Sequence, residues 1–118
     1  MGSKNLIISK SEAFALRIVR LYKFLQKENE FVLSKQILRS GTSIGANITE
    51  GQYAASIADF INKYVIAQKE AAETLYWLNL LVKSDYLALD DNTQTLIADC
   101  DELIRLLVSS IKTAKQKR

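Results

Sequence analysis

The chain has 118 residues, of which 48% are hydrophobic and 25% charged, and its net charge is +3 with a pI near 9.0. This composition is ordinary for a soluble globular protein, and the length requires no second domain. Proline and histidine are both missing. Without proline, long helices are favoured, and without histidine the chain lacks the commonest general base and transition-metal ligand.

Local motifs of enzymes are also missing from the sequence. It contains no phosphate-binding P-loop, no dinucleotide-binding glycine fingerprint and no nucleophile elbow. The single cysteine, Cys100, lies among leucines at helical spacing, which predicts a core thiol rather than a nucleophile. One cysteine excludes an intrachain disulfide and fits a reducing compartment. We therefore expect a protein that is not an enzyme and has no cofactor or metal.

The sequence contains no recognisable membrane-spanning or secretion signal. No apolar run approaches the roughly 18 residues of a membrane span, and the start, MGSKNLIISKSE, lacks the hydrophobic centre of a signal peptide. We expect a cytoplasmic protein that does not associate with membranes.

Apolar residues recur at helical spacing along four segments, which predicts an all-α fold. The linker between the first two, residues 28–32, is short, so we expect these two helices to be antiparallel neighbours. We expect a single domain, residues 1–118, with helices at about 10–27, 34–53, 57–83 and 91–114.

Helix starts are predicted from capping residues. Residues up to Ile8 are expected to form a short arm, followed by a capping box in which Ser9 pairs with Glu12. The second helix is expected to start at an N-cap, Ser34. The third helix is expected to start at a capping box formed by Ser56 and Asp59, and the fourth at an N-cap, Asp90 or Asp91.

Polar residues of the second segment converge on one arc of the predicted helix, about 120° from its apolar stripe. This polar stripe consists of Gln36, Arg39, Ser43, Asn47 and Glu50. Since it lies beside the core face and not opposite it, we expect it to be partly buried and hydrogen-bonded. Arg39 is expected to pair with Glu50 or a neighbouring chain, and Ser43 and Asn47 to bond across helices.

Two glycines, Gly41 and Gly45, stand inside this same helix, where each costs about 1 kcal/mol relative to alanine. Either they mark a break between two short helices, or they form a small-residue patch that a neighbouring backbone approaches closely. We favour one continuous helix, because both stripes keep their phase through the glycines.

The segment QILRSGTSIGANITEG resembles the signature of the 23S rRNA intervening-sequence protein family, and the similarity continues to the turn at Asp85 and Tyr86. The matching positions are Gln36, Arg39, Ser43, Ile44, Asn47, Glu50, Gly51, Phe60 and residues 71–73, and the departures are Gly41, Gly45 and Thr49.

The resemblance implies a bacterial, antiparallel up-down-up-down four-helix bundle that assembles into a ring-like homopentamer and has no established enzymatic activity. A related branch, the accessory protein of diversity-generating retroelements, is a basic pentamer that binds nucleic acid and a reverse transcriptase.

Candidate phosphate contacts lie on the first helix and at the end of the chain. They are Arg17, Arg20, Lys23 and Lys27, and the C-terminal cations Lys112, Lys115, Lys117 and Arg118. The C-terminal cations also complement the dipole of the last helix, and we expect them to fray into a tail. Either group can instead be a solvated face that only keeps the protein soluble.

Large apolar residues on the charged face of the third helix predict a subunit interface. They are Ile66, Trp77 and Leu81. The sequence thus favours a homo-oligomer that binds RNA or DNA backbone, or alternatively an adaptor that docks another protein, such as a reverse transcriptase, without affinity for nucleic acid.

Overall fold

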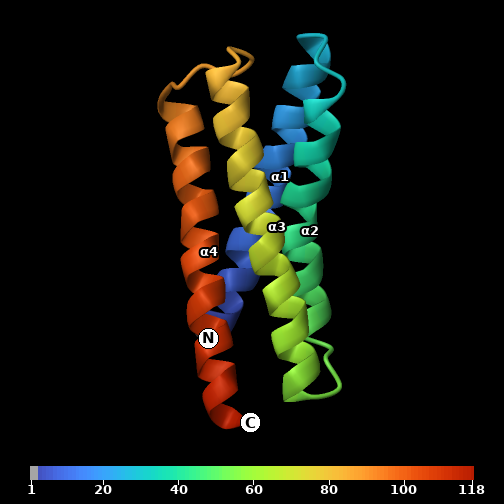
Figure 1. Ribbon diagram of the computed structural model, residues 1–118, viewed down its shortest axis with the longest axis vertical. Helices are drawn as coiled ribbons and strands as arrows, with labels where there is room; N and C mark the ends of the chain where they lie inside the picture. The colour runs from blue at the N-terminus through green and yellow to red at the C-terminus, as the bar shows by residue number, and fades with distance from the viewer. Residues whose placement is uncertain (1–2) are drawn as a thin grey trace.

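The computed structural model describes the backbone of residues 3–118, with side chains from residue 6 onward. Its regular elements there are the helices α1 (Ser3–Lys27), α2 (Leu33–Gly51), α3 (Ile57–Lys83) and α4 (Asp91–Lys117). Each helix runs antiparallel to the one before it, and α4 returns beside α1 to close the bundle (Figure 1). The fold is the expected all-α, up-down-up-down four-helix bundle, 47 Å long and about 22 Å across.

The N-terminal arm and the first capping box were wrong expectations. α1 starts at Ser3, and Ile7 is only 1% exposed in the core. Ser9 and Ser11 therefore lie inside the helix, where each hydroxyl donates to a carbonyl three residues earlier. Burial of Ile7 explains the difference, because it favours extension of the helix past the apparent cap.

The start of α2 is also capped differently from the prediction. Ser34 is fully buried inside the helix, and the carboxylate of Glu30 in the preceding loop caps the helix instead. It accepts backbone N–H bonds from Val32, Leu33 and Ser34 at 2.8 to 3.2 Å. Burial alone would raise the pKa of Glu30, but these bonds lower it below its ordinary value, since they favour the charged carboxylate.

The other two caps are confirmed. Ser56 accepts a hydrogen bond from the backbone N–H of Asp59 at 3.0 Å, and Asp90 accepts one from Thr93 at 2.9 Å. Both signals are local in sequence, so the residue at the cap and its donor stay together whatever packs around them.

One hydrophobic core runs the length of the bundle, with a stripe from each helix. Cys100 belongs to it, fully buried, and burial raises the pKa of its thiol to about 12, as expected for a structural cysteine. The largest fully buried side chains are Ile7, Phe14, Ile18, Leu25, Ile37, Ile44, Ile48, Tyr64, Leu78, Leu81, Leu103 and Leu107. Within residues 3–118, no helix combines the length and the apolar character of a membrane span.

The glycines of α2 do not break the helix, which runs continuously from Leu33 to Gly51. At Gly41, a Cβ atom would lie 2.8 Å from two side-chain carbons of Ile18 on α1. At Gly45, a Cβ would lie 3.5 Å from Ser11, which is an ordinary contact. Gly41 is therefore the position where the absence of a side chain lets α1 approach.

We expect Gly41→Ala to lower the free energy of unfolding by about 1 kcal/mol or more. Overpacking of a core costs about 1 to 3 kcal/mol, and Ile18 is β-branched and fully buried, so it has little freedom to move aside. Gly45→Ala is the matched control, and it should gain up to about 1 kcal/mol from helix propensity. Denaturant unfolding followed by circular dichroism measures both, and equal effects of the two substitutions would contradict the close approach at Gly41.

Candidate functional site

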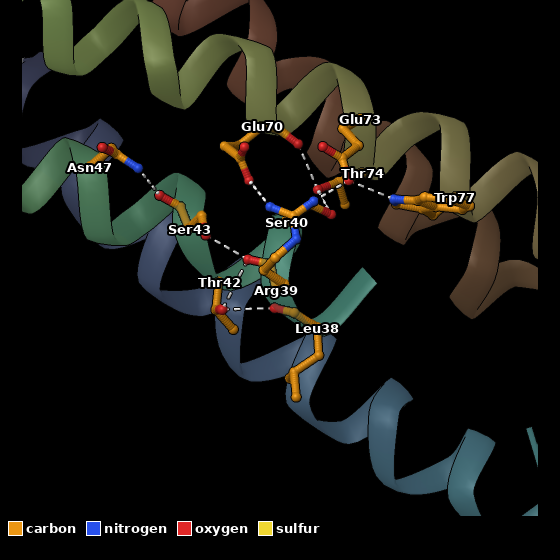
Figure 2. A network of polar contacts seen from close by, with 10 residues as sticks. All are labelled: Leu38, Arg39, Ser40, Thr42, Ser43, Asn47, Glu70, Glu73, Thr74 and Trp77. Atoms are coloured by element: carbon orange, nitrogen blue, oxygen red, sulfur yellow. Dashed lines mark hydrogen bonds and ion pairs between the residues drawn. The ribbon is translucent and has the colours of Figure 1, made fainter. Parts of the chain in front are cut away.

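The polar stripe of α2 is bonded to α3 at two residues, Arg39 and Glu50, and Arg39 forms more of these bonds. Its guanidinium donates to Glu70 at 3.0 Å and to Glu73, which also accepts a bond from the Trp77 indole at 2.9 Å (Figure 2). The hydrogen bonds from Trp77 and Arg39 hold the pKa of Glu73 below its ordinary value. The expected pairing of Arg39 with Glu50 is wrong, because α3 presents two carboxylates within its reach.

The small polar residues of the stripe do not bond across helices as expected. The Ser43 hydroxyl donates to the carbonyl of Arg39 at 2.6 Å, and the Asn47 amide donates to the carbonyl of Ser43 at 2.8 Å, both within α2 (Figure 2). Short polar side chains on a helix commonly find the carbonyl one turn earlier. Both are half-buried, while Gln36 and Glu50 at the ends of the stripe are exposed.

A buried polar contact between α2 and α3 does exist at a position outside the stripe. The hydroxyls of Ser40 and Thr74, each fully buried, are hydrogen-bonded at 2.8 Å. Sequence reasoning missed the pair, although Ser40 stands next to Gly41 among small residues, where helices approach closely. Lys63 of α3 binds Glu50 at 3.1 Å further along the same seam. The polar stripe and its neighbours thus join α2 to α3.

The three residues expected at a subunit interface lie in different environments. Leu81 is fully buried inside its own chain, so that part of the prediction is wrong. It follows Thr74 by seven residues, which places both on the side of α3 that faces α2. Ile66 and Trp77 are half-buried, and Trp77 packs edge-on against Tyr76, with ring centroids 5.0 Å apart. Tyr76, 59% exposed, is the more accessible aromatic of α3.

Arg17 does not lie free on the first basic face. It spans the seam between α1 and α4, where its guanidinium donates to Asp99 at 2.7 Å and to the Asn92 carbonyl and the Thr95 hydroxyl at 2.9 Å. Its side chain is only 23% exposed. Arg17 is therefore occupied in closing the bundle, and it is not available for phosphate.

The remaining cations of that face, Arg20, Lys23 and Lys27, are exposed and form no ion pair with any residue of the part that the structure describes. The C-terminal cations are likewise exposed and without ion pairs there. They do not fray into a tail as expected, because α4 stays helical as far as Lys117. The two groups lie toward opposite ends of the bundle (Figure 1).

A hollow of about 310 Å³ adjoins the C-terminal cations, between the start of α3 and the end of α4. Phe60 and Tyr64 lie on its α3 side, and Ser110, Ala114 and Lys117 on its α4 side. The sequence alone did not reveal it, because these residues are about 50 positions apart. We call it the end hollow.

Comparisons with known proteins agree with the fold. The family described as 23S rRNA-intervening sequence protein has a model that matches residues 3–109. A crystal structure from Bacteroides thetaiotaomicron, of a protein with unknown function from the S23 ribosomal protein family, shares 54% sequence identity with this chain. The match covers 94% of this chain and 99% of that chain, with a TM-score of 0.91. A search of curated proteins finds no match.

We expect Arg17→Gln to lower the free energy of unfolding by about 1 to 3 kcal/mol, because it leaves the acceptors on α4 without their donor. The matched control is Arg20→Gln, three residues further along α1 and unpaired, which should change stability by less than about 0.5 kcal/mol. Thermal and denaturant unfolding measure the difference. If the two variants are equally stable, Arg17 is not a clamp between α1 and α4.

Proposed function

We propose that this chain, which belongs to the 23S rRNA-intervening sequence protein family, forms a homopentamer of four-helix bundles. The pentamer has no enzymatic activity and binds nucleic-acid phosphates through the end of α4. The observation that carries the proposal is the exposed and unpaired state of the C-terminal cations. The family description names an intervening sequence of 23S rRNA, and a basic surface is compatible with such an anionic polymer.

Charge is distributed unevenly along α4. Its first half contains four acidic residues, the last of which is Glu102, whereas residues 103–118 contain five cations and no carboxylate side chain. The C-terminal cations therefore create a positive end on a chain whose net charge is only +3. Exposed lysines on a helix contact phosphates as point charges and do not read the bases. Binding through them is expected to be nonspecific and strongly dependent on salt.

Self-association is supported by large apolar side chains that remain exposed on three helices. Leu16 of α1 is 53% exposed, Tyr76 of α3 is 59% exposed, and Val108 of α4 is 46% exposed. Burial of such residues between copies is favourable, and a closed ring of five copies would gather five positive helix ends on one assembly.

The groups that commonly act in catalysis are missing, buried or already paired. The chain has no histidine to serve as a general base, and the buried Cys100, with its raised pKa, would be protonated at neutral pH. The charged pairs of the structure, such as Arg39 with Glu70 and Arg17 with Asp99, are occupied in joining helices.

A second candidate is an adaptor that docks another protein, for example a reverse transcriptase. The observation in its favour is a group of exposed apolar residues in the two loops at the other end of the bundle. These residues are Phe31, Val32, Tyr86 and Leu89, which are 42% to 70% exposed. An adaptor of this kind would need no affinity for nucleic acid.

Sedimentation velocity of the protein, alone and with a short single-stranded RNA, tests both parts of the proposal. We expect an oligomer at micromolar concentration, near five copies, that binds RNA at about 50 mM salt. If four phosphates are neutralised, affinity for a single strand should fall roughly 50-fold between about 50 and 200 mM salt. Replacing all C-terminal cations with glutamine should abolish the complex and leave the helix content unchanged.

The matched control replaces Arg20, Lys23 and Lys27 with glutamine, which removes nearly as much charge from the other end of the bundle. We expect this variant to bind RNA with only a small loss of affinity. A monomeric mass would remove self-association from the proposal. Absence of any RNA complex at low salt would favour the adaptor, and equal losses in both variants would contradict a site at the end of α4.

A further inference from the structure

The end hollow lies where the bundle is incomplete. α4 continues beyond the start of α1 at this end (Figure 1), so the inner sides of α3 and α4 face each other there without α1 between them. The volume of about 310 Å³ is at the lower end of the roughly 300 to 1,000 Å³ of small-molecule sites. The lining residues are Ile57, Phe60, Tyr64, Leu106, Ser109, Ser110, Thr113, Ala114 and Lys117.

Aromatic rings form the α3 wall of the hollow. Phe60 and Tyr64 pack on each other with ring centroids 4.1 Å apart and planes tilted by 31°. Tyr64 is 1% exposed, and its hydroxyl accepts a hydrogen bond from Gln52 at 2.7 Å, so its position is fixed by the fold. Phe60 is only partly buried and lies at the hollow. A supported aromatic ring of this kind is a platform on which another flat ring stacks.

Hydroxyl groups form the α4 wall. Ser109, Ser110 and Thr113 line the hollow, and none of the three is hydrogen-bonded to another side chain or carbonyl among residues 6–118. A hydroxyl both donates and accepts, so such a wall suits an occupant with mixed donors and acceptors along its edge. The two walls together favour a flat aromatic ring with a polar edge.

One cation, Lys117, lines the hollow, and Arg118 follows it in the sequence. Lys112 and Lys115 belong to the same end of α4 but line a separate hollow with Gln68. The occupant therefore combines a flat ring with a polar edge and a negative charge outside the hollow. A nucleobase attached to its phosphate backbone has all three properties.

We propose that the end hollow binds one unpaired base of a single-stranded nucleic acid, with the base against Phe60 and the adjoining phosphates at the C-terminal cations. This inference rests on the proposed function and adds the substrate class, a single strand. A base inside a duplex is stacked and paired, so its insertion here would require it to leave the helix, at a cost of a few kcal/mol. The hydroxyl wall tolerates different base edges, and sequence preference should be weak.

Another hollow, of about 300 Å³, lies between α1 and α4 at the opposite end, and it suits a base less well. Phe24 is the one aromatic residue lining it, and the carboxylate of Asp90 stands at its wall together with Arg17, which is already bonded to α4. A carboxylate repels phosphate, whereas the lining of the end hollow contains no acidic residue.

Fluorescence anisotropy with labelled strands tests the inference. The probes are a homopolymeric single-stranded DNA, an abasic strand of the same length and a duplex of the same length. We expect the intact strand to bind the wild-type protein about 5- to 150-fold more tightly than the abasic strand, which is the range for loss of one stacked base. Phe60→Leu should weaken the intact strand to a similar extent and leave the abasic strand unchanged.

Phe24→Leu is the matched control, since Phe24 is an aromatic residue of α1, 45% exposed at the opposite end of the bundle, and its replacement should not affect binding. Ser110→Leu is a second test that spares the aromatic pair, because it fills the hollow and should also weaken only the intact strand. Melting temperatures show whether each variant is folded. If Phe60→Leu is unfolded, the binding of Ser110→Leu tests the base site alone.

Equal binding of intact and abasic strands, or equal affinities of Phe60→Leu and Phe24→Leu for the intact strand, would overturn the base site while leaving phosphate binding intact. Equal or tighter binding of the duplex would overturn it as well. If no probe binds at low salt, the base site and the proposed function both fail.

Discussion

The contact of Ile18 with the backbone of α2 at Gly41 is the constraint on which the arrangement of the other helices depends. Any side chain larger than hydrogen at residue 41 would collide with Ile18, so α1 lies close against α2 only because that position is glycine. On its other side α1 shares the hydrophobic core with α4, and long polar side chains also bridge the two helices. Arg17 reaches Asp99, and Lys10 reaches Glu102 at 3.0 Å. The bundle thus has a closely packed seam and a seam bridged by ion pairs.

Most charges near the helix seams are used in holding helices together. Arg39 binds two carboxylates of α3, Lys63 binds Glu50, and Arg17 binds α4 at several acceptors. Such pairs contribute modestly to stability where they are exposed, and more where they are partly buried, as at Arg17. The cations that remain unpaired are therefore the informative ones. They are concentrated at the end of α4, beside the end hollow, and on the outer side of α1.

The fold could be predicted from the sequence because its signals are local. Apolar periodicity gave the four helices, and caps such as Ser56 and Asp90 need only a donor three residues away. Predictions failed where burial or a distant partner decides. Serine is a common N-cap residue, which is why Ser34 was predicted to cap α2. Instead, Glu30 in the loop accepts hydrogen bonds from the first N–H groups of the helix, and Ser34 is buried. The predicted cap at Ser9 is wrong because the start of α1 depends on burial of Ile7 in the core.

The candidate site could be predicted only in part, for a similar reason. Helical periodicity gives the angle of a side chain but not the residue that faces it. In the sequence, Arg17 and Arg20 therefore look equivalent, as two cations on one face of α1. Within the described part of the chain, only Arg17 has an ion-pair partner, Asp99, and that residue lies 82 positions away in the sequence. The C-terminal cations were visible as a group, but the hollow beside them depends on α3 and α4 meeting beyond the start of α1. No local pattern in either helix records that meeting.

The central claim is that the unpaired end of α4, together with the end hollow, is the surface that binds nucleic acid. Backbone amide chemical shifts of the isotope-labelled protein, recorded during titration with a short single strand at low salt, test it most directly. The account predicts shifts confined to the last turns of α4 and the first turns of α3, around Phe60. Shifts centred on the outer side of α1 or on the loops at the opposite end would contradict it.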